Sequence, residues 1–257
     1  MTAGTGAPRG TWSVACLDMA GTTITDAGTV RTAFEAALAA MGLAPGDRRF
    51  ERAMATIDAT MGQSKIEVFR IEVFRNVAGH VVGDGADPEP LAQAANTAFE
   101  RRYQVSLEAG LVEPVPGAAA TITALRAAGI AVCLTTGFSA PTRERLLAAV
   151  GWQSMADLVL SPAGGIRGRP WPDLPLTALL RLGGGAVSEL VVVGDTPADM
   201  ECGVRAGAGA VIGVLTGWAG AADLTAAGAR AVVPSVVDVA ALLGIPTDQE
   251  ATGRESS

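Results

Sequence analysis

Short, unbroken apolar segments alternate with helical patterns along most of this chain. The segments are rich in Val, Ile, Leu or Ala and do not alternate with polar residues, so they predict strands buried on both faces, as in a parallel sheet. The predicted strands are 13–17, 130–135, 157–160, 189–193 and 210–214, and helical patterns occupy 117–128, 140–150, 174–182 and 200–206. Because strands and helices alternate, we expect an α/β fold with a doubly wound parallel sheet.

The long interval between the first two predicted strands breaks this alternation. It contains no convincing strand pattern, and its Ala, Leu, Glu and Arg residues recur at helical spacing. The predicted helices there are 30–42, 47–60, 64–79 and 88–108. We therefore predict a helical cap at 29–112, inserted into a core of 11–28 and 113–245, where it would exclude water from a site at the sheet edge. The polar or Gly-rich ends, 1–10 and 246–257, are predicted to be disordered.

A tandem repeat lies inside the predicted cap, where Ile66-Glu-Val-Phe-Arg70 is followed at once by Ile71-Glu-Val-Phe-Arg75. Five extra residues would lengthen a helix by ~7.5 Å and rotate everything downstream by ~140°. We interpret the repeat as a neutral duplication absorbed at a helix end, with a reshaped cap as the alternative. Lys65, which lies upstream, keeps its register in both cases.

Composition limits the classes of partner. The 257 residues are 49% apolar and only 4% aromatic, so Ala, Val and Leu must fill a large core. The net charge of −7 argues against nucleic acids and anionic membranes, because both require clustered Lys and Arg. No apolar run has the length of a membrane span or a signal-peptide core, so we expect a cytoplasmic protein. Cys16, Cys133 and Cys202 lack metal-like spacing and are predicted to be buried thiols, and the single His80 is expected at the surface.

Two of the predicted strands lead directly to a carboxylate. Asp18 precedes a Gly-Thr-Thr turn, and Asp195 lies within Gly194-Asp-Thr-Pro-Ala-Asp199. The carboxyl ends of parallel strands share one edge of the sheet, where ligands bind. Mg²⁺ prefers carboxylates, waters and phosphate oxygens, so we predict a Mg²⁺ site made by Asp18 and Asp195, with a weaker contribution from Asp199. Asp18 is also the candidate nucleophile, since carboxylate attack on phosphorus would split one difficult displacement into two easier ones.

These segments resemble the motifs of the haloacid dehalogenase superfamily of phosphotransferases. The first motif matches Asp18-Met-Ala-Gly-Thr22, the second matches the Thr136 position of Leu134-Thr-Thr-Gly-Phe138, and the fourth matches Gly194–Asp199. The order and spacing agree over roughly residues 12–245, and the predicted cap lies at the insertion point that the family uses.

The resemblance implies functions for individual residues. The hydroxyl of Thr136 and neighbouring groups, including Thr22 and Gly137, would bind the phosphoryl group of a small anionic phosphonate or phosphate. The backbone carbonyl of Ala20 would join the carboxylates around Mg²⁺. A homodimer formed through the cap helices is a further implication.

Ala20 stands where most phosphatases of this superfamily carry a second Asp, which is their general acid and base. A methyl group cannot transfer a proton, so ester hydrolysis would lose a contribution usually worth roughly 10²–10⁴ in rate. Ala at this position, followed by Gly-Thr-Thr, is similar to the phosphonatase-like hydrolases, close to phosphonoacetaldehyde hydrolase. In that group the cation of the third motif is an Arg, and Arg169 in Gly168-Arg-Pro-Trp171 fits its position.

Lys65 is the chain's only lysine, and it lies in Met61-Gly-Gln-Ser-Lys65, which resembles the cap motif of the phosphonatases. There the Lys forms a Schiff base with the substrate aldehyde, so the carbon leaving phosphorus departs as an enamine and no ester oxygen needs a proton. Because Arg cannot form an imine, a lone Lys here favours a catalytic role. The resemblance implies that Met61 contacts the substrate. The alternative is an ordinary solvated Lys on a helix.

Two departures from the phosphonatase pattern keep other functions open. Val68 stands in place of a His, and Phe138 in place of a Tyr. We expect cleavage of the P–C bond in a small carbonyl phosphonate, with a phosphomonoesterase acting on a small phosphorylated metabolite as the alternative. A catalytically silent ligand sensor is a third reading, against which the intact set of Asp18, Thr136 and Arg169 argues.

Overall fold

The computed structural model describes residues 12–73 and 89–246. Its centre is a six-stranded sheet with the order β3-β2-β1-β4-β5-β6, in which every neighbouring pair of strands is parallel. The strands are β1 Val14–Asp18, β2 Ala131–Thr135, β3 Leu158–Leu160, β4 Leu190–Gly194, β5 Ala210–Val214 and β6 Ala231–Val233. The predicted parallel α/β sheet is therefore confirmed, and all five predicted strands are present.

The edge strand β6 was not predicted. It has three residues, all half-buried, and it pairs only with β5. A segment this short shows neither a buried apolar run nor an alternation, so the sequence pattern could not separate it from a loop.

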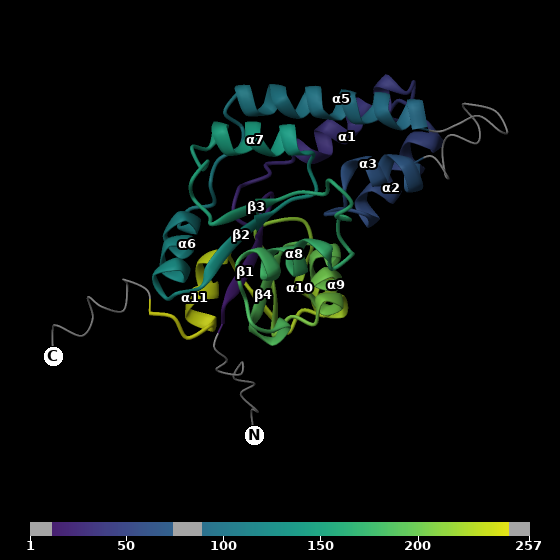
Figure 1. The fold of residues 1–257 in the computed structure, drawn as a ribbon. Coiled ribbons are helices and arrows are strands. Elements are labelled where there is room, and N and C mark those ends of the chain that lie inside the picture. The colour runs from purple at the N-terminus through teal and green to yellow at the C-terminus, as the bar shows by residue number, and fades with distance from the viewer. Residues whose placement is uncertain (1–11, 74–88, 247–257) are drawn as a thin grey trace.

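Helices cover both faces of the sheet, as a doubly wound fold requires (Figure 1). In β1, Ala15 and Leu17 pack into one apolar cluster with α6, α7 and α11, whereas Val14 and Cys16 pack into another with α8, α9 and α10. This split follows from the alternation of side chains along a strand. The bounds of these helices are α6 Ala118–Ala127, α7 Ala140–Ala149, α8 Asp173–Arg181, α9 Pro197–Ala206, α10 Ala221–Ala226 and α11 Val239–Leu242, with 3₁₀ turns at Val187–Glu189 and Val236–Asp238.

The elements described between β1 and α6 are all helical. They are α1 Thr29–Ala40, α2 Arg48–Ala59, α3 Lys65–Glu67, the π-helix η1 Val68–Val73 and α5 Glu89–Glu108. We call this group the helical cap. In Figure 1 it lies to one side of the sheet, and α5 runs beside α7 of the core.

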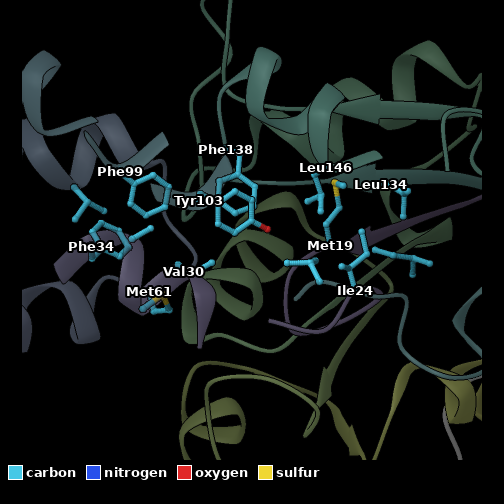
Figure 2. Packing of buried hydrophobic residues seen from close by; sticks show 14 of the residues in the cluster. Met19, Ile24, Val30, Phe34, Met61, Phe99, Tyr103, Leu134, Phe138 and Leu146 are labelled. Carbon is cyan, nitrogen blue, oxygen red and sulfur yellow. The ribbon is translucent and has the colours of Figure 1, made fainter. Parts of the chain in front are cut away.

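Aromatic side chains form the centre of the cap. The ring centroids of Phe34 and Phe99 are 4.8 Å apart, and those of Phe34 and Phe69 are 5.4 Å apart. Tyr103 of α5 continues this cluster to Phe138 of the core, with centroids 4.6 Å apart (Figure 2). The packing of cap on core is therefore continuous with the packing inside the cap.

Two adjacent chain segments connect the cap to the core. The backbone N–H of Thr25 donates to the carbonyl of Glu113 at 2.7 Å, and the N–H of Val115 donates to Thr23 at 2.9 Å. The hydroxyl of Thr25 also donates to the Glu113 carbonyl, at 3.0 Å. Because the two connections are bonded to one another, they hold the start of α1 beside the segment that follows α5.

Parts of the cap differ from the prediction, or lie outside the described residues. A single helix was predicted over 64–79, but the backbone forms one short α-helical turn at Lys65–Glu67 and then widens into the π-helix. The π-helix begins within the first copy of the five-residue repeat, a change of winding that the α-helical periodicity could not indicate. His80, the last two residues of the second copy, the predicted disordered end 1–10 and all of 246–257 except Pro246 lie outside the described residues. Among the helices that are described, none combines the length and apolar character of a membrane span.

Candidate active site

A cavity of about 310 Å³ lies between the carboxyl edge of the sheet and the cap. Its core wall includes the ends of β1, β2 and β4, and its cap wall includes α1 and the segment before α3. Most of the predicted site residues line it, namely Asp18, Ala20, Met61, Lys65, Thr136, Gly137, Arg169 and Asp195. Residues distant in the sequence are therefore brought to one place by the parallel register of the strands.

Asp18 is the last residue of β1 and is paired in register with Thr135. Its Oδ1 lies 2.5 Å from Nη2 of Arg169, in an ion pair that is almost completely buried. Burial raises the pKa of the Asp18 carboxyl to about 6, while Arg169 opposes that rise. The carboxylate is consequently the main form at neutral pH, as a nucleophile requires.

Arg169 joins two carboxylates. Its Nη1 donates to Asp199, so the guanidinium bridges Asp18 and Asp199 inside the protein. The pKa of this arginine is raised by the two carboxylates, which outweigh the cost of burial. A permanent buried cation therefore lies against the candidate nucleophile, in the position that a phosphoryl group would approach.

Asp195 is held by the turn after β1 and by the loop after β5. Its Oδ1 accepts a hydrogen bond of 3.1 Å from the Thr22 hydroxyl, and its Oδ2 accepts one of 2.8 Å from the backbone N–H of Trp218. A Cβ added to Gly21 or Gly217 would overlap the Asp195 carboxylate. Burial, and then the charge of Asp18, raise the pKa of Asp195.

The three aspartates have the donor set of a divalent-metal site. Asp18, Asp195 and Asp199 are all buried, and each offers an oxygen within 4.8 Å of the others. Buried carboxylates this close repel one another, and a divalent cation would offset that repulsion. Both oxygens of Asp199 already have partners, Arg169 on one and the N–H and hydroxyl of Thr196 on the other. Asp195 also accepts two hydrogen bonds, but it lines the cavity together with Asp18, whereas Asp199 does not. The set therefore fits Mg²⁺ best with Asp18 and Asp195 as ligands, and with Asp199 fixing Arg169.

The segment from Met61 to Lys65 packs directly on the core. The N–H of Lys65 donates to the carbonyl of Gly137 at 3.2 Å. Gly62, at φ +89°, has no space for a Cβ because the Thr196 side chain lies against it, and a Cβ at Gly137 would overlap the backbone of Gln63. These glycines allow the cap segment and the core to approach at backbone distance.

Lys65 is buried beside aromatic rings. Its Nζ lies 5.5 Å from the ring centroids of both Phe34 and Phe138, and it donates a long hydrogen bond of 3.5 Å to the carbonyl of Gln63. Burial and, to a smaller extent, Arg169 lower the pKa of Lys65 from 10.5 to about 8. About one amine in ten is then neutral at pH 7, against fewer than one in a thousand for an ordinary lysine.

A family model for haloacid dehalogenase-like hydrolases matches residues 12–207, which is more than half of the chain. The chain belongs to the haloacid dehalogenase-like hydrolases. The matched range includes β1, β2 and β4, the cap and all the residues that line the cavity except those after β5.

Individual relatives include both phosphonate and phosphate hydrolases. The phosphonoacetaldehyde hydrolase of Parabacteroides distasonis is 34% identical over 124 residues, which are 47% of this chain and 46% of that protein. "Probable phosphatase IndB" of Dickeya dadantii is 29% identical over 155 residues, 58% of this chain and 66% of that protein. The chain thus spans about half the length of the first of these curated relatives.

A solved structure has the same fold. The crystal structure of a phosphonoacetaldehyde hydrolase like protein from Oleispira antarctica superimposes with a TM-score of 0.75, covering 95% of each chain at 23% identity. This likeness concerns the arrangement of the sheet and the helices. In the present chain, that arrangement places the cavity at the carboxyl edge of the sheet.

Two of the predicted site residues lie behind the cavity wall of this hydrolase. Thr22 was expected to bind substrate, but its side chain is fully buried and its hydroxyl is bonded to Asp195. The turn directs the hydroxyl toward β4, so Thr22 orients the carboxylate instead of lining the cavity. Asp199 likewise is absent from the cavity wall. The hydroxyl of Thr136 accepts a 3.2 Å hydrogen bond from the N–H of Phe138 and so shapes the turn after β2.

The cavity also has wall residues that the sequence motifs did not indicate. Asp26 comes from the connection between core and cap, Arg31 from α1, and Trp218 from the loop after β5. The guanidinium of Arg31 lies 6.0 Å from the ring centroid of Trp218 and is paired with Asp58. The one available signal was a helix start, because an Asp shortly before the first residue of a helix is typical of a side chain that accepts hydrogen bonds from the free N–H groups of that helix.

Proposed function

We propose that this hydrolase cleaves the P–C bond of a small carbonyl phosphonate, with Asp18 as the nucleophile and Lys65 as the Schiff-base residue, in a Mg²⁺-dependent reaction. The observation that carries the proposal is the position of the only lysine. Its amine is buried on the wall that also holds Asp18, and its lowered pKa supplies the neutral form that imine formation needs. A solvated helix-face lysine would have neither property.

Substrate binding would bring the phosphoryl group to Arg169 and the carbonyl group to Lys65. Mg²⁺ held by Asp18 and Asp195, with the Ala20 carbonyl, would neutralise phosphoryl charge. Thr136 and Gly137, on the same wall, would bind the remaining oxygens. The cap segment covering Gly137 would exclude water from this end of the cavity.

The covalent steps then follow from the two nucleophiles. Neutral Lys65 adds to the carbonyl carbon and, with loss of water, gives an iminium. Asp18 Oδ attacks phosphorus, and the electron pair of the P–C bond moves into the C–C bond while the iminium nitrogen becomes neutral. An aspartyl-phosphate and an enamine result, so the leaving carbon takes no proton in this step. Ala20, which cannot donate one, is compatible with this chemistry.

Phosphomonoester hydrolysis is the second candidate. It is favoured by the likeness to the phosphatase of Dickeya dadantii and by Val68 and Phe138, which stand where the phosphonatase pattern has proton-carrying side chains. Val68 is buried in the apolar cluster of the cap and could not replace such a group. In this case a group other than Ala20 would have to protonate the leaving alcohol.

Borohydride trapping separates the two candidates. Purified enzyme is incubated with phosphonoacetaldehyde or with its product acetaldehyde, reduced, digested and analysed by mass spectrometry. Because Lys65 is the only lysine, the sole other amine is the chain's N-terminus, and the modified peptide identifies the site. We expect reduction to add the aldehyde carbon skeleton to Lys65, and Lys65→Arg to abolish both this adduct and phosphate release from phosphonoacetaldehyde.

The same samples are assayed for phosphate release from a panel of small phosphate esters with Mg²⁺. An unmodified Lys65 together with rapid ester hydrolysis would overturn the P–C assignment and leave the phosphomonoesterase. Lys65→Arg serves as the matched variant because it keeps the positive charge but cannot form an imine.

A further inference from the structure

Imine chemistry at Lys65 requires proton transfers that none of the residues discussed so far performs. Loss of water from the carbinolamine needs a proton on the departing hydroxyl, and hydrolysis of the final imine needs a base that activates water. Val68 and Phe138 carry no exchangeable side-chain proton. Arg31 and Arg169 remain protonated at every working pH, so they cannot alternate between acid and base.

Asp26 is the remaining titratable group on the cavity wall. Among the residues that line the cavity, the side chains that carry charge are Asp18, Asp26, Arg31, Lys65, Arg169 and Asp195. Asp18 attacks phosphorus and Asp195 fits the metal, and both belong to the core. Asp26 lies in the connection between core and cap and is half-buried, so it is held by the protein yet reached by solvent.

The start of α1 fixes the Asp26 side chain by one oxygen. Its Oδ1 accepts hydrogen bonds of 3.0 Å from the hydroxyl of Thr29 and from the N–H of Val30. Within residues 12–73 and 89–246, no group donates a hydrogen bond to Oδ2 of Asp26. One carboxylate oxygen is therefore anchored while the other is available to a molecule in the cavity.

Asp26 also interacts with the groups that face it from neighbouring elements. Its charge raises the pKa of Lys65, against the larger effect of burial, so the carboxylate and the amine are within electrostatic range. The charges of Asp26 and Asp18 also add to the effect of burial in raising the pKa of the Tyr103 phenol on α5. Tyr103 therefore stays protonated, and Arg31 on α1 stays charged, which leaves Asp26 as the acid–base candidate on this wall.

We propose that Asp26 is the proton-transfer residue for the Lys65 imine. This inference rests on the proposed Schiff-base function. Asp26 takes up a proton from solvent and donates it to the carbinolamine hydroxyl, which departs as water and leaves the iminium and an Asp26 carboxylate. After P–C cleavage the enamine carbon takes a proton from solvent and returns to the iminium. The Asp26 carboxylate then removes a proton from the water that adds to that iminium, so Asp26 is again protonated.

The test follows iminium formation alone, without phosphate chemistry. Wild-type enzyme, Asp26→Asn and the control Asp58→Asn are mixed with acetaldehyde, and the rate of borohydride-trapped adduct on Lys65 is measured. Asn keeps an oxygen that can accept the hydrogen bonds from Thr29 and Val30, so α1 retains its anchor. Asp58 is a carboxylate of α2 that pairs with Arg31 and is not on the cavity wall.

We expect Asp26→Asn to slow trapping by roughly 10²-fold, the scale of a lost acid–base group, and Asp58→Asn to leave the rate unchanged. Formate should restore part of the rate in Asp26→Ala, because a small carboxylic acid can enter the vacated space and carry the proton. A purely structural role of Asp26 would show no such rescue. Equal trapping in wild type and Asp26→Asn would overturn the role of Asp26 while keeping the Schiff base. Absence of an adduct in wild type would overturn both.

Discussion

Replacing Lys65 with Met should stabilise the protein at neutral pH. Burial lowers the pKa of Lys65 from 10.5 to about 8, so the folded state opposes protonation of this amine. Below pH 8 the lysine is protonated in the folded and the unfolded chain, and the whole difference between the two pKa values acts against folding. A shift of this size corresponds to a cost of about 3 kcal/mol, since one pKa unit is equivalent to roughly 1.4 kcal/mol.

The sign of the pH dependence follows from proton counts. Between the folded and unfolded pKa values the unfolded chain binds more protons, so the penalty shrinks as pH rises and disappears above the unfolded value. At pH 10 it should be below about 1 kcal/mol, from the same two pKa values. Lys65→Met should therefore raise the free energy of unfolding more at pH 7 than at pH 10, by about 2 kcal/mol or somewhat more.

Urea denaturation of metal-free protein at the two pH values measures this difference. Arg101→Met is a matched control, because it replaces an exposed guanidinium of α5 with the same side chain. Its effect on the free energy of unfolding should be the same at both pH values. An equal effect of Lys65→Met at pH 7 and pH 10 would show that Lys65 titrates as an ordinary solvated lysine and would refute the reasoning.

Three further predictions concern the core of the site. Asp18→Asn should lower kcat for phosphate release by at least ~10³ while circular dichroism shows the fold intact, and retention of a tenth of the activity would contradict the nucleophile assignment. Ala20→Asp should raise turnover of small phosphate esters roughly tenfold or more, because the new carboxyl group can protonate the leaving oxygen. If ester turnover stays unchanged in a variant that folds and binds Mg²⁺, the geometry of the cap, and not the missing acid, determines the reaction class. Gly217→Ala should weaken Mg²⁺ binding in calorimetry, because its methyl group would displace the Asp195 carboxylate. Gly220→Ala should leave binding unaltered, because the nearest atom to the added Cβ would be Oδ2 of Asp223 at 3.9 Å, an ordinary contact.

The parts of the fold that the sequence predicted are those in which one physical cause dominates. β1 and β4 are buried on both faces of the sheet, and burial on both faces requires an unbroken run of apolar residues. That run is the signal from which both strands were predicted. Parallel strands end at a common edge, so the meeting of Asp18 and Asp195 followed from chain order alone. The edge strand β6 and the π-helix η1 escaped prediction because they depend on pairing and winding that leave no periodic signal.

The orientation of side chains across long sequence separations was not accessible in this way. The hydroxyl of Thr22 could have faced the cavity or the next strand, and its bond to Asp195, 173 residues away, decides the matter. Asp26 shows the same limit, since its sequence context indicates a helix cap, and only the fold places that cap on the cavity wall. Local sequence motifs thus indicated which residues belong to the site, but not the direction in which each side chain points.

The position of Lys65 depends on the contact between cap and core more than on its own helix. α3 has only three α-helical residues, too few to fix a side chain by themselves. The lysine is instead held by the hydrogen bond from its N–H to Gly137 and by the Phe34 and Phe138 rings, one from the cap and one from the core. Moving the cap away would break these contacts and expose the amine, and its pKa would return toward that of a free lysine. The contact between cap and core is therefore what buries Lys65 and lowers its pKa, and the proposed imine chemistry depends on that contact.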